Sequence, residues 1–266
     1  MPVLLDPLHY ALGGLAGMIV GFALALVGGG GSILAVPLLI YLVGVGDAHV
    51  AIGTSALAVA VNAATGLASH ARAGTVRWRC GAMFAAAGIA GAAAGSTLGK
   101  AMDGEKLLAL FALVMLAVAG LMLRGGGRTG DPDARCGRAN APKVLGFGLA
   151  TGGFAGFFGI GGGFLIVPAL VTAARLPMIN AVGTSLIAVT AFGVTTAVNY
   201  AGSGLVSWPL ALLLVGGGIA GGLVGTCAAA RLSARGRLAP VFAVLIILVA
   251  LFMLWRSLAP AISATA

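Results

Sequence analysis

The sequence predicts an all-α membrane protein built from two repeats of inverted topology. This prediction depends on three observations: the composition, a series of apolar stretches and a duplicated set of motifs. Of the 266 residues, 60% are hydrophobic and 8% are charged, whereas soluble domains carry about 25% charged residues. The chain also contains 45 glycines, and small residues are typical of transmembrane helices that pack closely. These proportions exclude a disordered chain and argue strongly against a soluble enzyme.

Apolar stretches follow one another along both halves of the chain. Several approach the roughly 20 residues that a helical span needs, and all should be helical because lipid offers no partner to an unpaired backbone group. We expect each half to contain a glycine-broken helix pair, crossing or re-entrant, and then three transmembrane helices. The stretches are 8–27, 33–45, 50–69, 80–99 and 107–123, then 144–158, 164–174, 181–201, 208–230 and 238–255. The predicted divisions are a first repeat at 1–124, a linker at 125–142, a second repeat at 143–258 and a tail at 259–266.

Four motifs occur once in each half. GGGGSILAVP at 28–37 matches GIGGGFLIVP at 159–168, and AIGTSALAV at 51–59 matches AVGTSLIAV at 181–189. AGTVRW, which ends at Trp78, matches SGLVSW, which ends at Trp208. AGIAGAAAGST, which ends at Thr97, matches GGIAGGLVGTC, which ends at Cys227. The separation between the two copies stays almost constant from the first pair to the last, so the whole first half is duplicated.

Basic residues test the orientation of the two repeats, because Lys and Arg gather in cytoplasmic loops. If residues 8–45 formed one long broken helix, the 15 basic residues would divide 9 to 6 between the two faces. If the glycine cluster turns the chain back, they divide 12 to 3, which favours antiparallel repeats with a cytoplasmic linker and external termini. The larger group is Arg72, Arg77, Arg79, Arg124, Arg128, Arg135, Arg138, Lys143, Arg175, Arg231, Arg235 and Arg237, and the smaller group is Lys100, Lys106 and Arg256.

The two glycine clusters are the first candidate binding site. Consecutive glycines permit positive φ and close backbone approach, and a helix that begins directly after them would direct unpaired N–H groups back toward the cluster. Such a helix end carries roughly +0.5 of an elementary charge and binds anions. A tight packing corner between helices is the alternative. The residues concerned are Gly30, Gly31 and Ser32 in the first half and Gly161, Gly162 and Gly163 in the second.

Hydroxyl and amide side chains are the second group of candidates. Each GTS motif is expected to open an apolar helix, so that its hydroxyls either cap that helix or donate to a bound oxyanion. Two asparagines lie within or at the end of apolar stretches, where polar groups either serve function or bond to neighbouring helices. We interpret His70, beside Arg72 at the membrane edge, as bonding to a neighbouring helix. The candidates are Thr54, Ser55, Asn62, Thr184, Ser185 and Asn199.

Glycine ladders of the small-xxx-small type predict helix-packing surfaces. They consist of Gly91, Gly95 and Gly99 in the first half and Gly217, Gly221 and Gly225 in the second.

Charged residues are absent from the interior of the apolar stretches. A buried carboxylate relay or a catalytic carboxylate pair therefore has no residues to use, and a cationic substrate would lack a counter-charge. A site of amides and hydroxyls suits a small anion, and no metal or cofactor is predicted. The net charge of +9 lies in the segments between helices, which favours a topology signal over nucleic-acid binding.

Three cysteines show no CxxC or metal-ligand spacing, and their odd number argues against a disulfide framework. We expect Cys80 and Cys227 to be small apolar residues in helices and Cys136 to be a loop thiol.

At the paired glycine motifs, and at the two GTS motifs with the VRW and VSW that follow them, the chain resembles the TauE/SafE family of sulfite exporter-like permeases, over essentially all of residues 10–256. The resemblance implies a multi-pass protein of the bacterial inner membrane that moves sulfite, sulfonates or related small sulfur-containing or organic anions. Inverted repeats indicate alternating access to a site between the halves. The rival interpretations are an anion channel, a membrane-embedded sulfur relay that uses Cys80 or Cys227, and a purely structural subunit. The sequence identifies no coupling ion, proton or sodium, and is compatible with a homo-oligomer.

Overall fold

A computed structural model of the chain describes residues 7–27, 32–124, 131, 134, 136–137, 140–159, 162–233, 247, 249–253 and 255. Every regular element in these residues is a helix, which confirms the all-α prediction. The elements are α1 (Pro7–Val27), α2 (Ala35–Pro37), the π-helix η2 (Leu38–Leu42), α3 (Ala48–Arg72), α4 (Trp78–Lys100), α5 (Gly104–Arg124), α6 (Ala141–Phe158), α7 (Gly163–Ala174), α8 (Met178–Ala201) and α9 (Trp208–Ser233).

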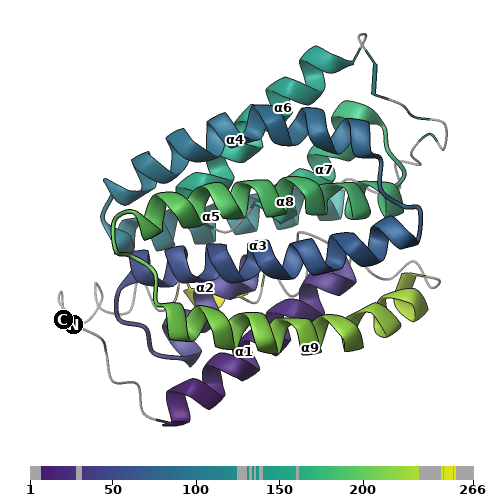
Figure 1. Cartoon of the computed structure of the whole chain (residues 1–266). Helices are drawn as coiled ribbons and strands as arrows, with labels where there is room; N and C mark the ends of the chain where they lie inside the picture. Colours follow the sequence, from purple (N-terminus) through teal and green to yellow (C-terminus); the bar gives the residue numbers. More distant parts are fainter. Residues whose placement is uncertain are drawn as a thin grey trace.

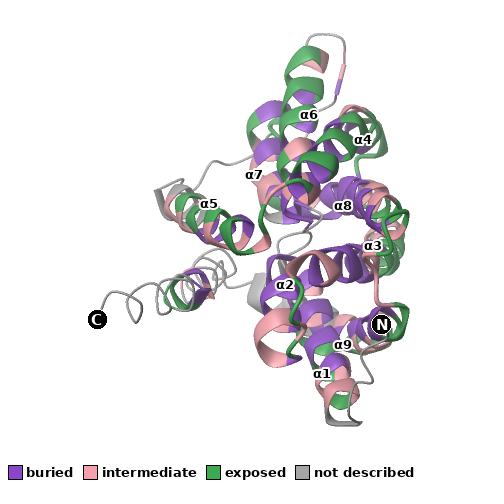
Figure 2. Ribbon diagram, turned by 90° about the vertical axis from the view of Figure 1, so that its left-hand side faces the viewer, coloured by how far each residue is buried: buried purple, intermediate pink, exposed green. Residues whose placement is uncertain are grey.

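Four of the described helices, α3, α4, α8 and α9, are long and apolar enough to cross a membrane. Figure 1 shows these four side by side, with α6 and α1 at the two outer edges of the stack. In the turned view of Figure 2, α5 projects to one side of the stack. In each of these four helices, part of the apolar segment that could span the membrane is buried inside the molecule. The buried share is 61% in α3 and 67% in α8, but only 44% in α4 and 33% in α9. The centre of the molecule is therefore the pair α3 and α8.

Each glycine-broken helix pair returns to the end of the molecule at which it started. In the first pair, a Cβ built on Gly44, just beyond η2, would lie 3.7 Å from Nε2 of His9 at the start of α1. In the second pair, the N–H of Asp131, ahead of α6, donates to the carbonyl oxygen of Arg175, directly after α7, at 2.9 Å. The chain therefore turns back between the members of each pair.

Glycines bring α9 against α1 and α4 against α6. A Cβ on Gly21 would collide with the backbone of Gly218, and a Cβ on Gly152 would collide with the backbone of Gly88. These two contacts correspond to each other, because Gly21 and Gly152, and likewise Gly88 and Gly218, hold equivalent places in the two repeats. The predicted glycine ladders of α4 and α9 also pack against the backbones of α6 and α1. Each outer helix of one half thus packs on a helix of the other half.

Candidate functional site

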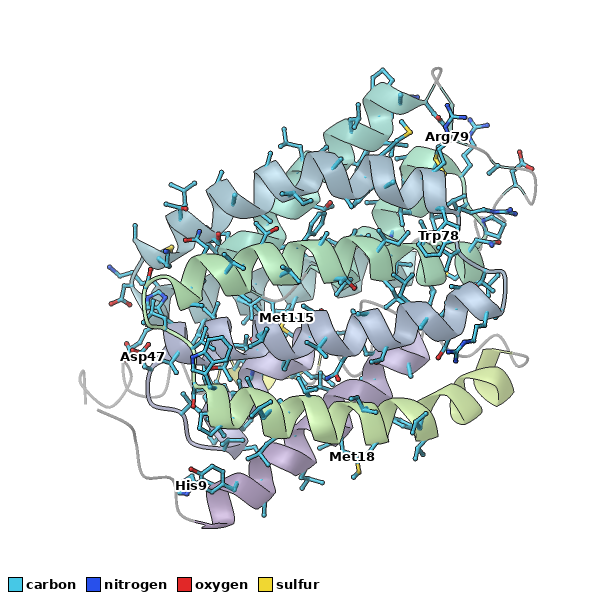
Figure 3. The ribbon with its side chains drawn as sticks, viewed as in Figure 1. His9, Met18, Asp47, Trp78, Arg79 and Met115 are labelled. Atoms are coloured by element: carbon cyan, nitrogen blue, oxygen red, sulfur yellow. A yellow bond between two sulfur atoms is a disulfide. The ribbon has the colours of Figure 1, made fainter. Side chains whose placement is uncertain are left out.

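The two ends of the helix stack carry different charged residues. One end, which we call the linker end, holds Arg72, Arg77, Arg79 and Arg175 together with the described linker residues. Asn180 Nδ2 of α8 donates there to the carbonyl oxygen of Thr75 at 2.8 Å. The other end, the lysine end, holds Lys100 and Lys106. In Figure 3, Trp78 and Arg79 lie at the linker end, whereas His9 and Asp47 lie at the opposite end.

The threonines of the two GTS motifs join the two halves. Oγ1 of Thr54 accepts a hydrogen bond from the N–H of Ser207 at 2.9 Å, and Oγ1 of Thr184 accepts one from the N–H of Arg77, also at 2.9 Å. Ser207 and Arg77 directly precede α9 and α4. Each buried threonine thus holds the residue that leads into a helix of the other half.

The expectation that the GTS motifs open their helices is wrong. Helix α3 begins at Ala48, where the carboxylate of Asp47 caps it by accepting from the N–H groups of His49 and Val50. Helix α8 begins at Met178, directly after Pro177. Thr54 and Thr184 therefore lie inside their helices, beyond the first turn, whose unpaired N–H groups are the ones that an N-cap satisfies.

The serines of the GTS motifs bond to their own helices. Ser55 Oγ donates to the carbonyl oxygen of Ile52 at 2.9 Å, and Ser185 Oγ donates to that of Val182 at 2.7 Å. Both side chains are fully buried. Serine commonly makes this local bond inside helices, so in this conformation neither hydroxyl proton is directed at a ligand.

The glycine clusters are described in part. Gly30, Gly31 and Gly161 lie outside the described residues, and Ser32 and Gly163 are buried. Helix α7 starts at Gly163, the last glycine of the second cluster, one residue before the predicted start at 164. Gly162 has a φ of 61°, and a Cβ there would collide with Ala155 of α6. Glycine is thus required at position 162 by both conformation and space, and anion binding at the clusters stays a prediction.

Asn199 belongs to a closed polar network at the lysine end. Lys100 Nζ donates to Oδ1 of Asn199 at 2.6 Å and to Oγ of Ser203 at 2.8 Å. Nδ2 of Asn199 donates to Oγ of Ser96 at 2.6 Å and to Oγ1 of Thr97 at 3.0 Å. The amide is therefore engaged at both its oxygen and its nitrogen, and the network joins the ends of α4 and α8.

Asn62 lines a cavity of about 80 Å³ between α1, α3, α8 and α9. Its side chain is 4% exposed. Nδ2 makes a long hydrogen bond of 3.4 Å to the carbonyl oxygen of Leu214 in α9, while Oδ1 has no partner among the described residues. Buried amide oxygens are seldom left unpaired. The amide of Asn62 therefore differs from that of Asn199, whose oxygen and nitrogen both make hydrogen bonds.

Polar residues recur every seven positions along the two central helices. Ser55, Asn62 and Ser69 are so spaced on α3, and Ser185 and Asn199 on α8, with Phe192 between them. Seven residues are close to two helical turns, so each series stays near one face of its helix. Of the predicted residues, Ser55 and Asn62 therefore lie near one face of α3, and Ser185 and Asn199 lie near one face of α8.

Cys80 and Cys136 form a disulfide, 56 residues apart in the sequence. Cys80 lies buried in a helix as predicted, but the argument against a disulfide is wrong, and Cys136 is not a loop thiol. The disulfide holds Cys136 of the linker against the first turn of α4, and both cysteine side chains are buried, at 2% and 3% exposed. Cys80 is consequently no free nucleophile in this state, which weakens the sulfur-relay interpretation, and the side chain of Cys227 lies outside the described residues.

A family model described as Sulfite exporter TauE/SafE matches residues 13–253. The chain belongs to the TauE/SafE family. A probable membrane transporter protein of Xylella fastidiosa is 51% identical over 251 residues, covering 91% of this TauE/SafE chain and 94% of the relative. A probable membrane transporter protein of Bacillus subtilis, YunE, is 29% identical, covering 79% and 84% of the two chains. One from Methanocaldococcus jannaschii is 27% identical, covering 75% and 79%.

No solved structure matches this TauE/SafE chain. Family and relatives together identify it as a multi-pass membrane transporter.

Proposed function

We propose that this TauE/SafE chain carries a small anion across the membrane by alternating access between two inverted repeats. The observation that supports this best is the reciprocal pair of hydrogen bonds from Ser207 to Thr54 and from Arg77 to Thr184. In each repeat, the threonine of the GTS motif accepts a hydrogen bond from the residue that precedes a helix of the other repeat. Such a pair of equivalent contacts is expected if a twofold axis between α3 and α8 relates the two halves. Inverted repeats of this kind rock around a site near the middle of the bilayer.

The substrate class is proposed from the charges and from the family. Among the residues whose burial is described, no Asp, Glu, Lys or Arg is fully buried, so a cation would find no counter-charge within the membrane. The family model carries the description of a sulfite exporter. Sulfite or a related sulfur-containing or organic anion is therefore the proposed substrate. The proposed contacts are Gly30, Gly31, Ser32, Thr54, Ser55, Asn62, Gly161, Gly162, Gly163, Thr184, Ser185 and Asn199.

The linker end and the lysine end differ in access: a cavity extends toward the first, whereas a hydrogen-bonded network closes the second. An alternating-access transporter shows this difference in each of its two states. Toward the linker end, the cavity beside Asn62 extends to His70. Toward the lysine end, Lys100 and Asn199 close the equivalent region. We therefore assign the described conformation to the state that faces the linker end. Opening of the Lys100–Asn199 network would then accompany the change to the opposite state.

Counterflow in reconstituted vesicles tests the proposed mechanism. Vesicles that contain the purified protein are loaded with unlabelled sulfite, and uptake of labelled sulfite from a dilute outer solution is followed. We expect transient accumulation of label that saturates with concentration, since an alternating-access carrier exchanges one bound anion for another. An anion channel gives label uptake that only follows the gradient and does not saturate. That result would replace the carrier by the channel, and no flux of sulfite, thiosulfate, sulfonates or carboxylates would end the proposal.

The linker end is proposed to face the cytoplasm of a bacterial inner membrane, since the described arginines gather there. Disulfides seldom persist in the cytoplasm, so we expect the Cys80–Cys136 pair to be reduced in growing cells and to oxidise on purification. The measurement is thiol alkylation in acid-quenched cells, compared with the purified protein. A reporter fused within 125–140 should read cytoplasmic and one at the C-terminus external. If Cys80 and Cys136 are oxidised in quenched cells and the linker reporter reads external, the proposed orientation is wrong and the linker end faces outward.

A further inference from the structure

The cavity beside Asn62 has a filled counterpart in the other half of the molecule. Aligning the two GTS motifs places Phe192 opposite Asn62 and Asn199 opposite Ser69. Asn62 and Ser69 line the cavity. Phe192 is instead fully buried, and it packs so closely on Gly88 of α4 that a Cβ there would collide with its ring. In the described state, the space is therefore present beside α3 and filled at the equivalent place beside α8.

Asn199 joins α8 to α4 at this equivalent place. Its Nδ2 donates to the hydroxyls of Ser96 and Thr97 and lies 3.5 Å from the carbonyl oxygen of Ala93. The glycine ladders align Ala93 with Leu223, which is part of the cavity wall. A carrier that closes the cavity and opens its counterpart must therefore separate Asn199 from α4.

Lys100, the last residue of α4, holds Asn199 in this contact. Its Nζ donates to the carbonyl oxygen and to Oδ1 of Asn199, at 3.1 and 2.6 Å, and to Oγ of Ser203 at 2.8 Å. These three acceptors are neutral oxygens. Asp103, the next carboxylate along the chain, accepts from N–H groups at the start of α5. The ammonium group is thus fixed by hydrogen bonds, but no carboxylate of the described residues neutralises its charge.

The charge of Lys100 has no equivalent in the other half. The aligned position is Ala230, and Ser69 takes the place of Asn199. The described residues that line the cavity include no Lys, Arg, Asp or Glu, and His70 is their one titratable group. An anion that enters from the linker end therefore meets no permanent charge, whereas one that enters from the lysine end meets an ammonium group.

We propose that Lys100 binds the transported anion in the state that faces the lysine end, and that the arriving anion displaces Asn199 from the ammonium group. Coulomb attraction adds to a hydrogen bond when the acceptor is charged, so an oxyanion replaces a neutral amide oxygen on Nζ favourably. The displacement frees Asn199 to move with α8, and the region around Phe192 opens as the counterpart of the cavity. Only hydrogen bonds are exchanged in this step. The inference rests on the proposed anion transport, and it gives the two states of the carrier unequal affinities for the anion.

Half-saturating sulfite concentrations measured from both sides test this role. Membrane vesicles of opposite orientation, made from cells that produce the full chain, expose either the lysine end or the linker end to labelled sulfite, and the reporter fusions assign the exposed end. Uptake by vesicles that lack the protein is subtracted. We expect Lys100→Gln to raise the half-saturating concentration at the lysine end by about tenfold or more, the loss expected for one hydrogen bond to a charged group. At the linker end the value should change far less.

Three further variants separate binding from closure of the contact and from charge in general. Ser203→Ala removes one acceptor of Nζ and loosens the same contact, but it keeps the ammonium group. It should lower the half-saturating concentration at the lysine end or leave it unchanged, because a looser contact populates the state that binds there. Lys106→Gln, at an exposed lysine of the same end, should change the value on neither side. Lys100→Arg keeps the charge and should lie closer to the unaltered protein than Lys100→Gln does.

The sign of the change in Lys100→Gln decides between binding and closure alone. A lysine that only closes the contact would, when replaced, lower the half-saturating concentration at the lysine end. That result, or an unchanged value, would overturn the role of Lys100 and leave the carrier in place. Lys100→Met, which keeps the apolar stem, replaces Lys100→Gln if the latter is not inserted, with the same expected rise. Absence of saturable sulfite transport by the unaltered protein in both orientations would overturn the proposed function and, with it, this inference.

Discussion

Leucine in place of Gly217 is expected to separate α9 from α1 and destabilise the protein by about 3 kcal/mol, the upper end of the usual range for overpacking. A Cβ at this position would collide with the carbonyl oxygen of Gly14 and lie 2.9 Å from the backbone nitrogen of Met18. Backbone atoms cannot rotate away as a side chain can, so the helices must move apart. Thermal unfolding in detergent and the yield of membrane-inserted protein measure the effect.

The neighbouring glycine supplies the control. A Cβ placed on Gly216 would have nothing within 4 Å, and this glycine is exposed, so Gly216→Leu places an apolar side chain toward lipid and should leave stability nearly unchanged. At the interface between α4 and α6, Gly152→Leu and Gly146→Leu form a second matched pair, since a Cβ on Gly152 collides with Gly88 and one on Gly146 meets nothing within 4 Å. Equal melting temperatures for Gly217→Leu and Gly216→Leu would show that close helix packing does not hold α1 and α9 together.

The helices were predictable because a membrane allows few alternatives. An apolar stretch in lipid must satisfy its own backbone groups, and a helix does so locally. The stretch 208–230 accordingly became α9 (Trp208–Ser233), and 164–174 became α7 (Gly163–Ala174). The prediction that α3 begins at the GTS motif was wrong because glycine and hydroxyl residues are also typical of the start of a helix. The residue that caps α3 is Asp47, and aspartate is a good N-cap.

Contacts between segments far apart in the sequence were not predictable from local pattern. The disulfide joins Cys80 of α4 to Cys136 of the linker, 56 residues apart. The bonds from Ser207 to Thr54 and from Arg77 to Thr184 depend on how one repeat docks on the other. The cavity did have a signal in the sequence: aligning the two GTS motifs and continuing along both helices sets Asn62 against Phe192. A polar residue aligned with a large apolar one marks a place where the packing of the two halves differs.

Valine in place of both Thr54 and Thr184 is expected to lower the free energy of unfolding by about 2–4 kcal/mol, with about half of the loss from each change. Valine keeps the shape of threonine but leaves the N–H of Ser207 or Arg77 without the oxygen that accepts it at 2.9 Å. The two bonds lie at opposite ends of the molecule, so their effects should add. Denaturant unfolding of the single and double variants provides the measurement.

Thr190→Val is the matched control for the two threonines. Its hydroxyl donates to the carbonyl oxygen of Leu186 in its own helix at 2.8 Å, so its loss orphans no N–H and should change stability little. An unchanged stability of the double variant would show that the two bonds do not hold the repeats together. Flux per folded molecule then separates two roles. A threonine that only accepts from the facing N–H leaves the flux unchanged, whereas one that also donates its own proton to the anion lowers it.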